Sequence, residues 1–251
     1  MNTVTSVTYA RDFIASLAAS GRYHFTSIEA RNALNVSADA TKLALNRLTR
    51  QSRIASPGRG FYVIVPPEYR SLGCLPADQF VPALMDQLEQ PYYAGLLSAA
   101  QYHGAAHHRP QEFQVLVCKP RRPIHCGRIR VSFLMRKNLS DVPVQGFNTL
   151  RGTVQVSTPL DLVGYNKAVG GIDQVVIILS ELVEQIEPEK LAQAARIAPV
   201  TWSQRLGYLL ELINAEEKSS ALKRYIKLSL CFQIILTNVP FEIWIGNFSL
   251  M

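Results

Sequence analysis

Apolar side chains recur at steps of three and four residues along residues 38–50, which gives this stretch a helical period. The inward face of this helix is predicted to carry Thr41, Ala44, Leu45 and Leu48. A shorter helix is predicted before it, because Thr26-Ser27-Ile28-Glu29 has the pattern of a capping box. Ser37 is a suitable N-cap for the 38–50 helix. The pattern therefore predicts two helices joined by a tight turn.

A hairpin is predicted after these helices. Residues 54–56 and 61–65 can pair as strands, because Gly58-Arg59-Gly60 between them allows a sharp turn. Pro66-Pro67 ends the second strand, since proline has no N–H to donate. Residues 8–20 carry an apolar stripe of their own and predict a first helix. Three helices followed by a hairpin indicate a winged helix-turn-helix over residues 1–68.

The outward face of the 38–50 helix is polar and basic, as in helices that enter the major groove of DNA. The hairpin tip presents an arginine that can reach a phosphate or the minor groove. The residues predicted to contact DNA are Ser37, Asp39, Lys42, Leu43, Asn46, Arg47, Arg50 and Arg59. Helix-turn-helix pairs also serve protein–protein contacts, and a basic helix face is often only solvated. The arginine at the tip and the basic front together favour DNA.

A second domain of mixed character is predicted over residues 77–251, after a turn-like linker at 69–76. Its predicted elements are helices at 78–89 and 93–103, strands at 113–118, 129–134 and 154–157, a helix that begins with Thr158-Pro159, and helices at 175–186, 188–196 and 202–214. The predicted fold class is therefore α+β: an N-terminal winged helix-turn-helix, then a mixed α/β domain with a mainly helical C-terminal half.

A basic segment lies inside the second domain. Residues 119–137 contain seven Lys/Arg and no Asp/Glu. One interpretation is a hairpin with a solvated basic rim; the other is a docking surface for RNA, the DNA backbone or an acidic protein. The residues that would form this surface are Lys119, Arg121, Arg122, Arg128 and Arg130.

The remaining polar residues give little support for catalysis. His103 and His107 have the H-x3-H spacing, and His108 follows, but Gly104 intervenes and no glutamate follows His103, so ordinary helix-end residues are the better interpretation. Asp161 is better explained as a carboxylate at a helix start than as a catalyst. Phosphate-binding loops, nucleophile elbows and paired carboxylates are absent from the sequence. We therefore predict a protein that is not an enzyme and uses no cofactor or metal; the alternative is a nucleic-acid-processing enzyme with a winged-helix DNA-binding head.

Composition and charge limit the class of protein and its cellular location. The chain has 251 residues, 48% of them hydrophobic, and a net charge of +7, which admits an anionic partner without naming it. Four cysteines lie at irregular spacing, at positions 74, 118, 126 and 231, and are interpreted as reduced, buried or incidental thiols of a cytosolic protein. The N-terminus lacks the pattern of a signal peptide, and no apolar run has the length of a membrane span. The predicted location is the cytoplasm.

Three strings in the second domain carry a family resemblance. They are YYAGLLSAAQYHGAAHHRPQEFQVLV at 92–117, VSTPLDLVGY at 156–165 and SQRLGYLLELI at 203–213. With these strings the chain resembles the AbiEi antitoxins over residues 8–228. The resemblance implies a winged helix joined to an antitoxin domain, in the antitoxin of a bacterial type IV toxin–antitoxin pair. It further implies repression of its own operon, action against a nucleotidyltransferase-like toxin without a stable complex, and a role in abortive phage infection.

The sequence departs from that family in two regions. Members often carry Glu-Arg after the Thr-Pro, whereas here Leu160-Asp161 follows Thr158-Pro159, so no role is carried over for that pair. Residues 229–251 hold one charged residue, Glu242, where the family ends in a polar stretch and a strand around a tryptophan. We interpret this tail as a diverged or frame-shifted end, which puts neutralisation in question even where DNA binding is kept.

Overall fold

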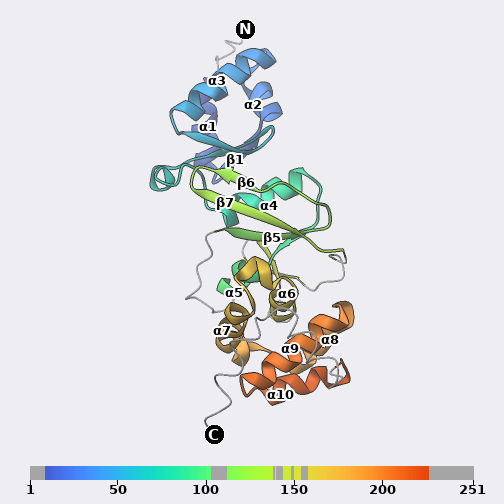
Figure 1. The fold of residues 1–251 in the computed structure, drawn as a ribbon. Coiled ribbons are helices and arrows are strands. Elements are labelled where there is room, and N and C mark those ends of the chain that lie inside the picture. Colours follow the sequence, from blue (N-terminus) through green and yellow to red (C-terminus); the bar gives the residue numbers. More distant parts are fainter. Residues whose placement is uncertain are drawn as a thin grey trace, which may run out of the picture. The chain divides into compact units, whose positions relative to one another are not determined.

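The structure is a computed structural model that describes residues 9–102, 112–137, 139, 144–147, 150–153 and 158–225. The contacts divide the chain into two compact units (Figure 1). The first unit comprises Met1–Tyr92, Gln111–Lys137 and Gly146–Arg151. The second unit comprises Tyr93–Pro110, Asn138–Gln145 and Gly152–Met251.

The winged helix opens the first unit. Its elements in order are α1 (Ala10–Ala19), β1 (His24–Thr26), α2 (Ser27–Leu34), α3 (Ala38–Arg50), β2 (Ile54–Gly58) and β3 (Phe61–Ile64). The strands form an antiparallel sheet in the order β1-β3-β2, and the three helices pack together beside it (Figure 1). This arrangement confirms the predicted winged helix-turn-helix. The sequence did not predict β1, a strand of three residues that runs directly into the cap of α2.

The core of the winged helix is drawn from residues 13–64. Phe25 is fully buried between Phe13, whose ring meets it edge-on at 5.3 Å, and Tyr62, whose ring stacks on it at 5.5 Å. From α3 the core receives Leu45 and Leu48, which confirms the predicted inward stripe. An amphipathic helix thus gains its stability by burying one face against the sheet and α1, which leaves the other face free for binding.

Both predicted helix caps are present. The Thr26 hydroxyl accepts a hydrogen bond from the Glu29 N–H at 3.1 Å, and a Glu29 carboxylate oxygen accepts one from the Thr26 N–H at 2.7 Å. The Ser37 hydroxyl accepts a hydrogen bond from the Ala40 N–H at 3.2 Å. Asn35 ends α2 in the left-handed region (φ 50), which gives the tight turn between the helices.

The first unit continues beyond the wing. Its further elements are η1 (Pro67–Tyr69), α4 (Ala77–Gln87), β5 (Phe113–Val117), β6 (Ile124–Cys126) and β7 (Ile129–Met135). Strands β6 and β7 form an antiparallel hairpin, β5 pairs in parallel with β7, and α4 packs on β7. Strand β6 also packs against β2 of the wing.

The segment predicted as a linker, 69–76, includes Cys74 and Leu75, which are buried in this unit. The predicted boundaries after residue 68 and before residue 77 remain a prediction about which fragments fold and act alone.

The second unit is mainly helical in its C-terminal part. Its elements are α5 (Leu96–Tyr102), α6 (Thr158–Gly164), η2 (Asn166–Val169), α7 (Ile172–Leu182), η3 (Val183–Gln185), α8 (Pro188–Ile197), α9 (Val200–Leu212), α10 (Glu216–Ser219) and η4 (Ser220–Tyr225). The division between the units falls within three strands, β4 (Tyr92–Ala94), β8 (Val144–Phe147) and β9 (Leu150–Thr153). Ala94 of β4 pairs in parallel with Gly152 of β9. Helices α6 and α9 pack closely, and a Cβ atom added to Gly164 would lie 2.3 Å from the Trp202 ring.

One predicted element was wrong at its start. The helix predicted over 93–103 is a strand through Ala94, and α5 begins only at Leu96. All three residues of β4, Tyr92, Tyr93 and Ala94, are buried. The sequence therefore shows no alternation of apolar and polar positions that would distinguish a strand from a helix here.

The predicted helices 78–89, 175–186, 188–196 and 202–214 are confirmed, and the second of them ends in η3. The strand predicted at 154–157 lies outside the described residues. No helix in the described part of the chain is long and apolar enough to cross a membrane.

Candidate nucleic-acid interface

The outer face of α3 is exposed along its whole length. Asn46 and Arg50 lie one turn apart on this face, and Leu43 beside them is 59% exposed. Ser37, Asp39, Lys42 and Arg47 are exposed as well. Among the residues that the structure describes, none is an ion-pair partner of Lys42, Arg47 or Arg50. We call the set Asp39, Lys42, Leu43, Asn46, Arg47 and Arg50 the α3 front.

The α3 front has the chemistry to read DNA. An asparagine amide can pair bidentately with adenine, an arginine with guanine, and an aliphatic side chain can contact a thymine methyl group. Lysine and arginine at the sides of such a helix neutralise backbone phosphates. Because the opposite face of α3 is locked in the core, the front is held at a fixed angle to the wing.

The wing tip is short and firmly held. Only Arg59 and Gly60 lie between the paired residues Gly58 and Phe61. Gly60 adopts φ +72, which a residue with a side chain rarely does, and its carbonyl accepts a hydrogen bond from the Ser27 N–H at 2.9 Å. The tip is therefore fastened to the start of α2. Arg59 is exposed there, with its side chain in solvent.

The basic segment of the sequence becomes the hairpin β6–β7 and the strand ends around it. Lys119, Arg122, Arg128 and Arg130 are exposed, and we call these four residues the basic rim. Arg130 pairs across the hairpin with the exposed His125, while the next residue, Val131, is buried. Beyond this pair the alternation ends, since Ser132, Phe133 and Leu134 are all half-buried.

Arg121 differs from the rim residues, although it was predicted to share their surface. Its guanidinium donates a hydrogen bond to the Gln90 side chain at 3.1 Å and lies 5.3 Å from the centre of the Phe133 ring. Burial lowers the pKa of Arg121 from its usual value. Arg136 is also buried. Arg121 thus has partners within its own unit and joins the segment before β6 to the residues after α4.

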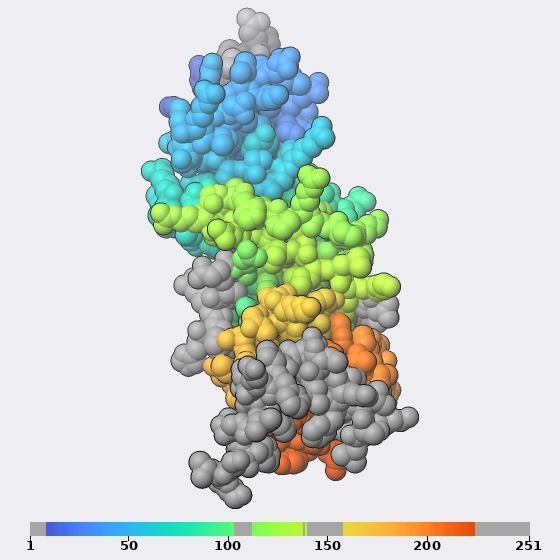
Figure 2. Space-filling view, in the orientation of Figure 1, coloured from blue at the N-terminus to red at the C-terminus, as the bar shows by residue number. Residues whose placement is uncertain are grey.

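The α3 front and the basic rim belong to one compact unit. The hairpin strand β6 packs against β2 of the wing. Figure 2 shows surface from both α3 and the β6–β7 hairpin on one side of this unit. The exposed cations of the α3 front and those of the basic rim are thus carried by the same unit.

Other polar candidates give no site. Asp161 is fully buried and accepts a hydrogen bond from the Tyr93 hydroxyl at 3.0 Å, which is a structural role. The three histidines from the H-x3-H segment lie outside the described residues. In the described part of the chain, no group of three or more metal-binding side chains comes together.

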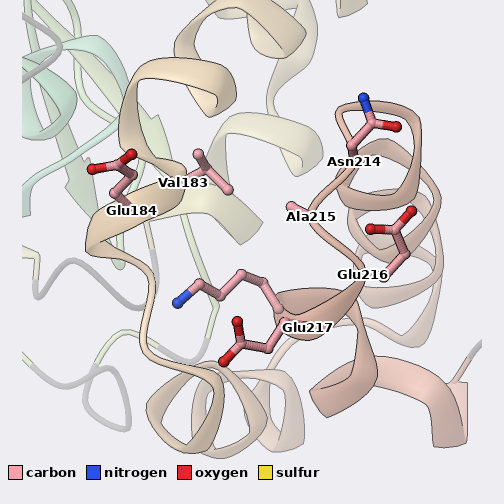
Figure 3. A pocket seen from close by; sticks show the side chains of 7 residues that line it. Val183, Glu184, Asn214, Ala215, Glu216 and Glu217 are labelled. Atoms are coloured by element: carbon pink, nitrogen blue, oxygen red, sulfur yellow. The ribbon is translucent and has the colours of Figure 1, made fainter.

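A pocket in the second unit has a volume of about 240 Å³. It is lined by Val183, Glu184, Asn214, Ala215, Glu216, Glu217 and Lys218 (Figure 3). Glu184 and Glu216 stand on opposite sides of it, and both side chains are exposed. Solvated carboxylates that do not converge hold no ligand in a fixed geometry.

Comparison with known proteins agrees with the resemblance noted in the sequence. A family model described as the AbiEi antitoxin C-terminal domain matches residues 93–212. Among solved structures, the chain is similar to one titled "Crystal structure of RV2827C protein from Mycobacterium tuberculosis". That similarity has a TM-score of 0.64 at 16% sequence identity and covers 87% of this chain and 82% of the other, which supports the fold. No curated protein matches the sequence. The chain therefore contains a C-terminal domain of the AbiEi antitoxin family.

Proposed function

We propose that this protein is the antitoxin and transcriptional autorepressor of a type IV toxin–antitoxin operon. In this proposal the winged helix binds the operon's own promoter, and the AbiEi domain counteracts a nucleotidyltransferase-like toxin without forming a stable complex with it. The protein acts in the cytoplasm, has no catalytic activity and contributes to abortive phage infection. The domain match over 93–212 supports the antitoxin role.

The main observation in support of DNA binding is the α3 front. Its cations are exposed and have no ion-pair partner among the described residues, on a helix whose back is buried in a winged-helix core. Unpaired cations on a protein surface attract a polyanion and release its counterions on binding. Base recognition is assigned to Leu43, Asn46 and Arg50. Phosphate contacts are assigned to Lys42 and Arg47, and Arg59 adds a backbone or minor-groove contact from the wing.

We also propose a division of roles. Residues 1–68 suffice for a DNA-binding fold, because the winged-helix core is drawn from residues within that range. Residues 77–251 carry neutralisation. The basic rim, although it lies in the same unit as the winged helix, serves neutralisation first, since α3 and the wing already account for promoter binding.

The test is a gel shift on the protein's own promoter at several salt concentrations. Replacing Asn46 and Arg50 by alanine should weaken specific binding at least about 10-fold, because each base contact contributes roughly 1–3 kcal/mol. Arg196→Ala removes one positive charge from an exposed site on α8 and serves as the matched control, with affinity unchanged.

Two outcomes would reject the proposal. Specific binding that survives the double substitution would show that α3 is not the reading helix. Metal-dependent cleavage of the promoter fragment in the same incubation would favour the alternative, a nucleic-acid-processing enzyme.

A further inference from the structure

Two cysteines that are distant in sequence lie on neighbouring segments of the first unit. Cys74 lies between η1 and α4, and Cys126 ends β6, yet the residues next to them, Gly73 and Gly127, are in contact. Cys74 is fully buried and Cys126 is 7% exposed. We propose that Cys74 and Cys126 are a modification site: a dithiol that low-molecular-weight disulfides oxidise to an intramolecular disulfide.

The backbone around the two residues has the close approach that a disulfide requires. The Arg128 N–H donates a hydrogen bond to the Leu72 carbonyl at 2.7 Å, which joins the two segments two residues from each cysteine. Gly73 and Gly127 flank the cysteines, and a Cβ atom added to Gly127 would lie 2.9 Å from the Gly73 Cα. A disulfide requires two Cα atoms roughly 4.4–6.8 Å apart, and contact between the residues next to Cys74 and Cys126 is what such an approach requires.

The surroundings assign different roles to the two sulfurs. Hydrogen bonds from the Cys74 thiol and from the Ser56 N–H lower the pKa of Cys126 despite its burial. The Ser56 N–H is available because the register of β2 and β3 shifts between Ala55 and Gly58. The hydrogen bond to Cys126, together with burial, raises the pKa of Cys74. Cys126 is also the more exposed of the two, so we assign it as the attacking thiolate and the fully buried Cys74 as the resolving thiol.

The reaction balances with one equivalent of a disulfide such as oxidised glutathione. The Cys126 thiolate attacks one glutathione sulfur, which forms a mixed disulfide and releases one glutathione thiolate. Cys74 then loses its proton and attacks Cys126, which forms the intramolecular disulfide and releases the second glutathione. Two protein thiols are oxidised, and one glutathione disulfide is reduced to two thiols.

The test uses the full chain with Cys118 and Cys231 replaced by serine, so that the pair supplies the remaining thiols. After incubation with oxidised glutathione, mass spectrometry should find a product two hydrogens lighter, with no glutathione adduct. Digestion without reductant should give a peptide that joins Cys74 to Cys126. The closed loop of about 50 residues should raise the melting temperature by roughly 5–10 °C, and dithiothreitol should reverse that rise.

A third substitution, Cys74→Ser in the same background, is the matched control. It removes the resolving thiol, so Cys126 should retain one glutathione. A background protein that stays fully reduced, or that carries glutathione without the joined peptide, would overturn the proposal. Peptide mapping of the oxidised wild-type chain tests for the same Cys74–Cys126 peptide and does not depend on how well the control variant folds.

Discussion

Arg121 and Arg122 are neighbours in the sequence with different surroundings. Arg122 is exposed, whereas Arg121 lies on the Phe133 ring and donates to Gln90. Charge and spacing alone assigned them to one surface, because Gln90 is distant in sequence and its approach depends on how α4 packs on the strands. Exposure on α3 was easier to predict, since the helical period places its polar residues opposite a buried stripe.

Gly127 is a residue at which a single added methyl group has a defined cost. It adopts φ +58, and a Cβ atom there would lie 2.2 Å from the Leu72 carbonyl oxygen. Gly21 also has positive φ (+77) but open space around it. Gly127→Ala should therefore lower the free energy of unfolding by about 2 kcal/mol more than Gly21→Ala, because both carry the backbone strain and only one adds a clash. Urea titration of the two variants measures the difference, and equal losses would contradict the packing described for Gly127.

At the scale of single elements, the caps of α2 and α3 were predictable because they depend on residues three positions apart. The hairpin turn at Arg59-Gly60 was predictable for the same reason. Strand β1 and the parallel pairing of β5 with β7 were not, because they depend on contacts between distant segments. The meeting of Cys74 with Cys126 likewise has no local signal.

The capping box of α2 gives the winged helix a pH dependence. Burial alone would raise the pKa of Glu29, but hydrogen bonds from Arg22 and Thr26 outweigh it and hold that pKa below its usual 4.5. A lowered carboxylate pKa contributes stability that is complete above the unfolded value and lost as pH falls through the folded one. Glu29→Gln should therefore destabilise the protein at pH 6, and the gap from wild type should shrink below pH 4.5. Urea midpoints measured from pH 6 to pH 3.5 decide this, and a gap that stays constant would exclude the proposed role of the carboxylate.

Arginine variants around the β6–β7 hairpin distinguish residues that bind a partner from a residue that stabilises the fold. Replacing Arg122, Arg128 and Arg130 by serine should leave the melting temperature nearly unchanged, because exposed charges contribute little to stability. The same variant should lose toxin neutralisation in a rescue assay, with a smaller loss in the promoter gel shift. Arg121→Ser is the contrasting variant: it should cost about 1 kcal/mol of stability through the lost hydrogen bond and ring contact. A triple variant with wild-type rescue and gel shift would reduce the basic rim to a solvated surface.

For the whole molecule, the first unit combines the winged helix with strands that follow it by some 50 residues in sequence. The prediction of α+β architecture held because it rests on many local patterns at once. The predicted boundary after residue 68 followed the proline pair and the turn-like residues 69–76, which hold no sign that Cys74 and Leu75 are buried in the same unit. Which contacts close a domain depends on long-range packing, and periodicity in one segment does not contain that information.

The most direct test of the central claim is growth rescue. The nucleotidyltransferase-like reading frame expected beside this gene is induced in bacteria that express the full chain from an unrelated promoter. We predict restored growth with the wild-type chain and with the Asn46→Ala, Arg50→Ala variant, because neutralisation does not depend on reading DNA. Failure of the soluble, folded wild-type chain to restore growth would contradict the assignment of this protein as an antitoxin.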